Sequence, residues 1–211
     1  MSVVTISGYG NKTIFANMIS GMKSLADVLE SKQYQIVNTV ARKTMTDTRR
    51  EIRAEVNLTD RYIRDRMDLV PASSGRAVAY VIARARATRL ATYGARQLTR
   101  AAKRAKGDPL RGIGSGRKQA GISVAVDGMG ARKPMPGAFL IPLRAGKEPS
   151  SNGMGVFIRV GPGKKDIKHE YGPSVNQLFR WNLRVSEQKI SAALDAETQR
   201  VLEYELKRIY R

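Results

Sequence analysis

The chain has 211 residues, 42% of them hydrophobic, and its 38 Lys and Arg against 18 Asp and Glu give a formal charge of +20. This length and composition predict one globular domain with extensions, argue against wholesale disorder, and predict a polyanionic or acidic partner that neutralises the surplus charge. Because the chain has no cysteine, disulfides, thiolate nucleophiles and the usual structural zinc sites are excluded.

Residues 1–20 are expected to form an N-terminal arm. They contain neither a basic segment followed by an apolar core, as a secretion signal has, nor a run of about 20 apolar residues that would span a bilayer. We therefore expect a soluble protein that is made in the cytoplasm and has no membrane partner.

Two helices are predicted before residue 72. Apolar residues recur at helical spacing, without Gly or Pro, from Ser24 to about Val56, and predict one amphipathic helix of roughly 50 Å. Its weakest stretch is "TMTDT" at 44–48, because Thr and Asp side chains compete for backbone hydrogen bonds. The second helix is expected to begin with Thr59 as its N-cap and to end before Pro71.

The segment 76–90, "RAVAYVIARARATRL", alternates in a way that predicts a strand. One face carries Arg84 and Arg86 beside bulky apolar residues, and the other is rich in alanine. The small alanine side chains are expected to let a helix approach closely, with the long N-terminal helix as a candidate.

The second half of the chain begins with a basic, Gly-rich segment at 100–118, which we expect to be an exposed loop. Three short strands follow at 120–128, 137–143 and 155–161, each bounded by Gly or Pro, and their spacing predicts an antiparallel sheet. Pro142 is expected on an edge strand or at a strand end, because proline lacks the N–H that a ladder needs.

Two more helices are predicted after a Gly-Pro turn, a short one at 174–183 capped by Ser174 and a terminal one capped by Ser186. The fold class is therefore α+β: an antiparallel or mixed sheet flanked by a long N-terminal helix, short helices and a C-terminal helix. The expected division is an arm at 1–20, an α+β domain at 21–185 and a C-terminal helix at 186–211.

Positive charge is concentrated between Arg84 and Lys118, where eleven basic residues meet one acid, Asp108. Such asymmetry favours contact with nucleic-acid phosphate or with an acidic protein surface. Few aromatic residues could stack bases, so any contact with nucleic acid is expected to be independent of sequence. The candidate anion- or acidic-partner-binding residues are Arg84, Arg86, Arg89, Lys103, Arg104 and Lys106.

The stretch "IKHEYGPSV" at 167–175 holds the only histidine of the chain, His169. Adjacent residues on an extended chain point in opposite directions, so His169 and Glu170 do not converge on a reacting atom, and no second histidine completes a metal site. The Gly-rich stretches at 112–118 and 161–165 lack the full spacing of a phosphate-binding loop. We predict no catalytic residue, metal or cofactor, and a structural corner or interface formed by His169, Glu170, Tyr171, Gly172 and Pro173.

The order of these pieces resembles the minor tail protein Z family of tailed bacteriophages, also called tail completion proteins, over about residues 22–185. The most telling stretches are "PGAF" at 136–139, "VFIR" at 156–159 and "YGPSV" at 171–175. The resemblance implies a non-enzymatic virion protein at the head-proximal end of the tail, needed for head-tail joining and present in the host cytoplasm during assembly. It also implies a homo-oligomeric, hexameric ring around the DNA channel, with tail terminator, tail tube or connector proteins as neighbours.

The charge agrees with such an assembly in one respect. DNA carries one charge per about 1.7 Å of axis, so a ring about 40 Å tall would face about 24 phosphates, whereas six chains of +20 bring about 120 charges. Much of the charge is therefore expected to meet acidic surfaces of neighbouring proteins. The alternatives are a sequence-independent DNA-binding protein and the adjacent tail terminator, with a nuclease as a more distant one.

Overall fold

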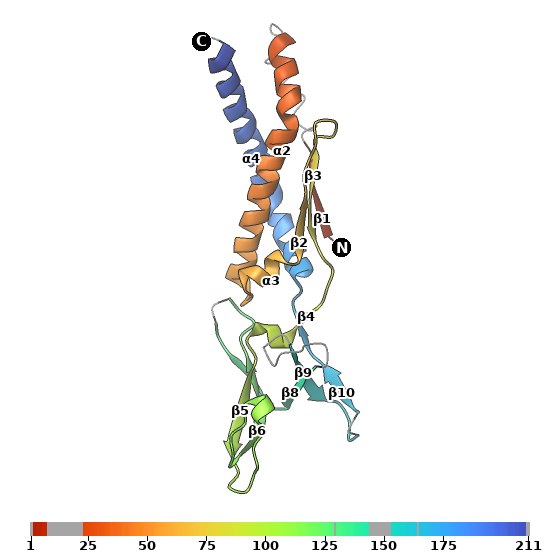
Figure 1. Ribbon diagram of the computed structural model, residues 1–211, viewed down its shortest axis with the longest axis vertical. Coiled ribbons are helices and arrows are strands. Elements are labelled where there is room, and N and C mark those ends of the chain that lie inside the picture. The colour runs from red at the N-terminus through yellow and green to blue at the C-terminus, as the bar shows by residue number, and fades with distance from the viewer. Residues whose placement is uncertain (1, 8–22, 129, 144–152, 164, 210–211) are drawn as a thin grey trace. The chain divides into compact units, whose positions relative to one another are not determined.

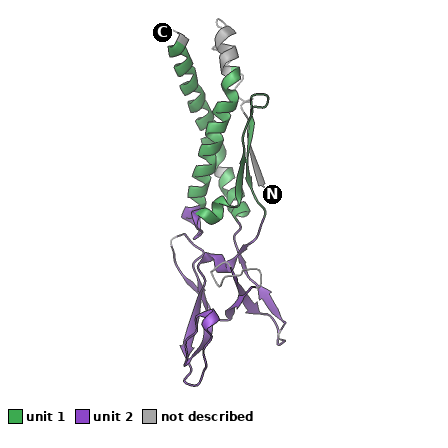
Figure 2. Ribbon diagram, viewed as in Figure 1, with its two compact units in different colours: residues 1–52, 61–85, 175–211 green, residues 53–60, 86–174 purple. Residues whose placement is uncertain are grey.

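The computed structural model describes residues 2–7, 23–128, 130–143, 153–163 and 165–209 (Figure 1). The chain divides into two compact units, the first formed by residues 1–52, 61–85 and 175–211 and the second by residues 53–60 and 86–174 (Figure 2). Long helices and several small antiparallel sheets confirm the α+β class. Of the expected N-terminal arm, residues 1 and 8–20 lie outside the described residues.

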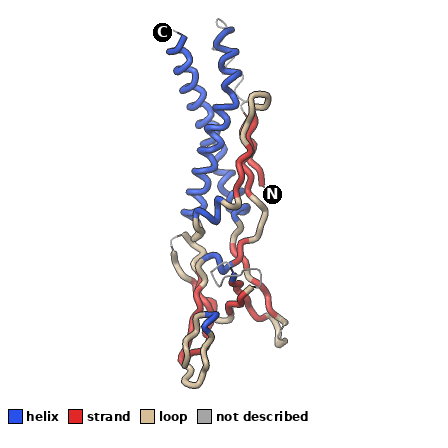
Figure 3. Tube along the Cα trace, viewed as in Figure 1, coloured by secondary structure: helices blue, strands red, loops and turns tan. Residues whose placement is uncertain are grey.

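The first unit contains two long helices and a three-stranded antiparallel sheet. Helix α2 spans Lys23–Glu55, with its last turn assigned to the second unit, and helix α4 spans Val175–Ile209. Figure 3 shows these helices beside the sheet, whose strand order is β1 (Ser2–Ser7), β3 (Val78–Ala83), β2 (Met67–Val70). The core is formed by apolar side chains of α2, β3 and α4, among them Val37, Val40, Ile52, Val81, Val175 and Phe179.

The prediction of one long N-terminal helix is confirmed, and α2 continues without a break through residues 44–48. The hydroxyl of Thr46 donates to the carbonyl of Arg42 at 2.9 Å, one turn earlier in the helix. The Thr44 and Thr48 side chains are buried and line a space that α4 borders. Short side chains at these positions thus serve the contact between the helices.

The prediction that Ser186 caps a separate terminal helix is wrong, because α4 runs unbroken from Val175 to Ile209. Ser186 is buried in the middle of α4 and borders the space beside α2. No Gly or Pro separates the two predicted segments, and burial of the serine outweighs its modest helix propensity.

The helix predicted between Thr59 and Pro71 is also wrong in extent. Helix α3 covers only Asp60–Arg64, and Met67–Val70 form β2, which pairs with β3 from Met67 opposite Ala83 to Val70 opposite Tyr80. Pairing along β3 has overridden local helix propensity, and Pro71 ends a strand instead of a helix.

Strand β3 shows the alternation that its sequence predicts, with Ala79, Val81 and Ala83 buried. The helix lying against β3 and β1 is α4. Two buried asparagines attach the helices to the chain around the sheet. The Asn38 amide donates to the carbonyl of Ala72 at 3.0 Å and accepts from its N–H at 2.7 Å, and the Asn176 amide donates to the carbonyl of Ala83 at 2.8 Å.

The second unit is built from short antiparallel ladders. One sheet has the order β5 (Arg96–Ala101), β6 (Arg117–Val124), β7 (Lys133–Met135), and another has the order β10 (Ile167–His169), β9 (Met154–Arg159), β8 (Ala138–Pro142). A third ladder pairs β4 (Thr88–Arg89) with β11 (Tyr171–Gly172), and the turns η2 (Leu90–Tyr93) and η3 (Pro109–Arg111) complete the unit.

Three of the strands in this unit were predicted, at 120–128, 137–143 and 155–161, and each is found within a few residues of its expected bounds. Pro142 is the last residue of the edge strand β8, as predicted. The strand predicted across 76–90 ends at Ala83, because residues 84–87 are exposed and unpaired as strands. The predicted loop at 100–118 is shorter than expected, since its ends belong to β5 and β6.

Candidate partner-binding surface

Strands β5 and β6 and the segment that joins them form a projecting ribbon, residues 96–124, which we call the basic finger (Figure 1). Its connecting segment is ordered by backbone hydrogen bonds. The N–H of Ala102 donates to Gly116 at 2.8 Å, and the N–H of Gly116 donates to Ala105 at 2.9 Å. Asp108 and Ile113 exchange two further bonds at 2.7 and 2.8 Å, and the Ile113 side chain is buried. The finger is therefore a folded element and not an open loop.

Gly107 makes this fold of the finger possible. Its φ is +77°, a conformation that side chains rarely adopt, and a Cβ there would lie 2.8 Å from the backbone of Gly114. The two stretches of the connecting segment can approach so closely only with glycine at this position.

The finger carries eight basic residues and one acid. Arg111 pairs with Asp108 at 3.2 Å, and Arg117 donates to the hydroxyl of Thr99 at 2.7 Å. The other six cations are exposed and form no ion pair with any acid that the structure describes: Arg96, Arg100, Lys103, Arg104, Lys106 and Lys118.

Two of these cations face each other directly. Arg100 and Lys118 are register partners in the β5–β6 ladder, where like charges destabilise the pairing. A finger that retains this repulsion carries charge beyond what its own fold can neutralise, which is the arrangement expected of a surface that meets an anionic partner.

The structure brings together only part of the predicted anion-binding set. Lys103, Arg104 and Lys106 all lie in the connecting segment of the finger. Arg84 lies in the first unit, where its guanidinium donates to Asp68 at 2.8 and 3.2 Å, and this hydrogen bond raises the pKa of Arg84. It is thus already paired within the chain.

The remaining two members of the set lie in the second unit. Arg86 is exposed between β3 and β4, and Arg89 is a half-buried residue of β4 opposite Tyr171. Neither belongs to the finger, so Arg86 and Arg89 remain separate candidates for partner contact.

The predicted corner at 169–173 is a stacked aromatic cluster joined to the ladder between β4 and β11. The His169 ring stacks on Phe157 with centroids 4.5 Å apart and an angle of 16°, and its other neighbour is Tyr171 at 4.5 Å. Burial is the main cause that lowers the pKa of His169, with a further lowering from Arg89 and an opposing effect of Glu170. A buried Nε2 atom without a hydrogen-bond partner completes the site.

This geometry does not suit acid-base chemistry at His169, because the imidazole is held between rings and its Nε2 faces no acceptor. Glu170 instead serves the backbone: its N–H donates to Val156 at 2.8 Å, and its carbonyl accepts from Leu90 at 3.2 Å. Its carboxylate lies 3.5 Å from the ammonium of Lys168.

The end of the corner is packed against Tyr93, a fully buried residue of η2. The Tyr93 hydroxyl donates to the carbonyl of Pro173, and a Cβ at Gly172 would overlap the Tyr93 ring. Gly172 therefore permits close packing, and Pro173 provides an acceptor for a buried hydroxyl. Tyr171 is exposed.

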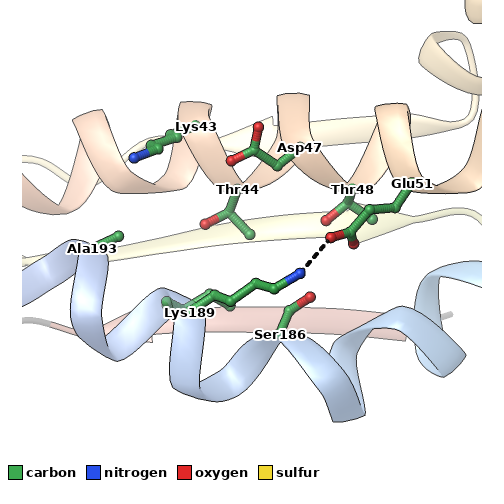
Figure 4. A pocket seen from close by; sticks show the side chains of 9 residues that line it. Lys43, Thr44, Asp47, Thr48, Glu51, Ser186, Lys189 and Ala193 are labelled. Carbon is green, nitrogen blue, oxygen red and sulfur yellow. Dashed lines mark hydrogen bonds and ion pairs between the residues drawn. The ribbon is translucent and has the colours of Figure 1, made fainter.

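A pocket of about 240 Å³ lies between α2 and α4 in the first unit (Figure 4). Its wall contains the hydroxyls of Thr44, Thr48 and Ser186, and Lys189 donates across it to Glu51 at 2.9 Å. Two lysines and two acids border the pocket, so it has no net charge that would favour an ion. The Lys189–Glu51 ion pair links the two helices beside the pocket.

Sequence reasoning missed three residues that shape the second unit. Tyr93 lies in a stretch without a clear period, and Arg132, whose guanidinium donates to the carbonyl of Gly94 at 2.6 Å and of Ser123 at 2.8 Å, lies in a loop. Leu110, exposed on the finger, could have been found as an isolated bulky residue in a basic segment, directly after an Asp-Pro turn signal.

None of the described helices is long and apolar enough to cross a membrane. Within the same described residues, no group of three or more His, Cys, Asp or Glu side chains is arranged to hold a metal ion. The described structure has a cationic ribbon in one unit and a pair of long helices in the other, and it is that of an α+β protein.

A comparison with protein-family models gives the family. The model for prophage minor tail protein Z (GPZ) matches residues 15–211, and the chain belongs to this family. The resemblance drawn from the sequence is thereby confirmed, and the chain is a bacteriophage tail protein with a structural role in the virion. A comparison with curated proteins found no match, and a comparison with solved structures found none either.

Proposed function

We propose that this chain is the ring-forming tail completion protein of its phage, located at the head-proximal end of the tail and needed for joining head and tail and for DNA passage. Membership in the minor tail protein Z family carries the proposal. The basic finger supports it, because its six exposed cations that form no ion pair within the described residues suit a component whose countercharge comes from neighbours in an assembly.

The proposed partners are other copies of the chain in a hexameric ring, the adjacent terminator, tube or connector proteins, and channel DNA bound without sequence preference. We propose no catalytic activity, since the single histidine is stacked on Phe157 and contacts the tilted ring of Tyr171, and the family is that of a structural tail component.

A phage deleted for this protein tests the proposal. We expect lysates with filled heads and with tails that do not yield infectious particles, and electron microscopy of purified wild-type particles should place the chain as a closed ring at the neck. Normal infectivity of the deletion phage, or absence of the chain from mature particles, would contradict the proposal.

A sequence-independent DNA-binding protein is the second candidate, favoured by the same cations. It predicts that the purified chain binds bare duplex DNA, with an affinity that falls steeply as salt rises because bound phosphates release counterions. Failure to bind duplex at low salt would remove this candidate while leaving the ring unaffected.

A further inference from the structure

The basic finger carries an apolar side chain that phosphate binding does not explain. Leu110 is 66% exposed, although it lies in the ordered turn η3. That turn is closed by the N–H of Arg111 donating to Asp108 at 3.1 Å and the N–H of Gly112 donating to Pro109 at 3.0 Å. A large apolar side chain held at a fixed place among cations gains free energy by entering an apolar pocket of a protein, whereas contact with phosphate gains nothing from it.

The position of Leu110 does not suit insertion into DNA. Proteins that unstack base steps insert an apolar side chain between neighbouring bases. Such a side chain has to protrude from the part of the protein that enters the groove. Turn η3 lies against β8, and Figure 3 shows it as a short helical segment beside the ribbon, set back from its tip. The turn that carries Leu110 therefore lies against β8 and not at the tip of the ribbon.

The finger also lacks side chains that could stack on bases. Residues 96–124 include no aromatic residue. Three of its neutral polar side chains are engaged within the finger: Gln97 donates to the carbonyl of Gly121 at 2.6 Å, Gln119 accepts from Arg111 at 3.4 Å, and Thr99 accepts from Arg117. Stacking on aromatic rings, a main source of affinity for nucleic acid beyond phosphate contact, is therefore missing.

Cations that form no ion pair in the described structure gather on one face of the ribbon. Alternation along β5 places Arg96 and Arg100 on the same face, and Lys118 lies directly opposite Arg100, because the extra residue of the register shift lies in β6. A protein surface with carboxylates along that face would neutralise all three.

We propose that the basic finger docks on an acidic neighbouring protein of the virion, with Leu110 in an apolar pocket and the six cations that form no ion pair within the described residues against carboxylates around that pocket. Another copy of this chain fits less well, because each copy itself carries +20. The inference rests on the proposed function and names the chemistry of one neighbour.

In vitro complementation tests the pocket. Purified chain is added to lysates of cells infected with the deletion phage, and the concentration that restores half of the infectious particles is measured. Leu110→Ser should raise this concentration about tenfold to a hundredfold, as expected for losing one buried leucine. The matched control is Val160→Ser, since Val160 is equally exposed, at 63%, but lies outside the finger. A half-maximal concentration that Leu110→Ser leaves unchanged, or that Val160→Ser raises equally, overturns the proposal.

Charge is tested in the same assay. Lys103→Glu with Lys106→Glu should raise the half-maximal concentration at least tenfold, whereas Arg42→Glu with Arg61→Glu, which changes the net charge equally at exposed sites of the first unit, should leave it unchanged. Equal effects of the two double variants would mean that only total charge matters, and would refute a specific docking site on the finger.

Cross-linking identifies the molecule that Leu110 contacts in the particle. Because the chain has no cysteine, Leu110→Cys carries a single maleimide-benzophenone label. Irradiated particles containing the labelled chain should yield a cross-link to an acidic segment of another virion protein, identified by mass spectrometry. A cross-link to DNA, to another copy of this chain or to a basic segment, or no cross-link, contradicts the inference. The proposed function fails separately, if wild-type chain does not restore infectivity at all.

Discussion

The buried amide of Asn38 offers the sharpest test of how the first unit holds together. Asn38 and Ala72 are both buried, and the amide satisfies both backbone groups of Ala72, at 3.0 and 2.7 Å. Asn38→Ala leaves that N–H and that carbonyl without partners. At about 1.5 kcal/mol for each unsatisfied buried group, the free energy of unfolding should fall by about 3 kcal/mol.

The loss of free energy of unfolding is measured by urea unfolding followed by far-ultraviolet circular dichroism, which reports mainly on α2 and α4. In thermal unfolding followed by the same signal, the midpoint temperature should fall by roughly 6 to 12 °C, since 1 kcal/mol shifts a chain of this size by about 2 to 4 °C. Thr39→Ala is the matched control: its exposed hydroxyl bonds only to Gln35 in its own helix, so the change should stay within about 0.5 kcal/mol. A cost below about 1 kcal/mol for Asn38→Ala would refute the assigned role.

Three further predictions concern the corner and the helix pair. The pKa of His169 is lowered in the folded chain, so the unfolded state binds more protons below the ordinary pKa of 6.5, and the free energy of unfolding should decline as pH falls from 6.5 toward the folded pKa. His169→Phe should flatten this decline in urea titrations. A decline that persists in the variant would mean that another group causes it. Gly172→Ala should cost about 1–3 kcal/mol by overpacking against Tyr93, whereas Gly137→Ala, with open space around it, should be nearly neutral in calorimetry. Glu51→Ala and Lys189→Ala should have non-additive effects on the free energy of unfolding in a double-mutant cycle, with a coupling energy that shrinks as salt rises. Strict additivity at low salt would show that the ion pair between Glu51 and Lys189 does not contribute to stability.

The long helix was predictable because its signal is local. Residues 24–56 repeat their apolar positions without Gly or Pro, and no distant partner is needed to recognise the pattern. Strand β3 and strands β6, β8 and β9 were predictable for a similar reason, since each is a short apolar run between turn signals.

The elements that sequence reasoning missed depend on distant partners. Strand β2 exists because Met67–Val70 lie beside β3, and the two-residue strands β4 and β11 pair across more than 80 positions of sequence. Strand β5, "RQLTRA", has four charged or polar residues in six and becomes a strand through its ladder with β6. Tertiary pairing of this kind overrides local propensity and leaves no periodic trace.

The candidate site was predictable in composition but not in arrangement. The density of cations at 84–118 is visible in the sequence, yet Arg84 belongs to the first unit and forms an ion pair there with Asp68. That Lys103, Arg104 and Lys106 share a folded connecting segment depends on glycine geometry at Gly107 and on backbone bonds that composition does not encode.

The two units differ in how they neutralise their charge, and this difference bears on function. Several cations of the first unit have an acid within the unit: Arg50 with Asp47, Arg84 with Asp68, Lys189 with Glu51, Arg200 with Glu197, and Arg208 with Glu205. The finger of the second unit has one acid for eight cations. Since unpaired like charges repel and weaken the fold that carries them, such a surface is stabilised when an acidic partner binds. Docking should therefore protect the finger, and proteolysis within residues 102–116 should slow when the chain enters the particle.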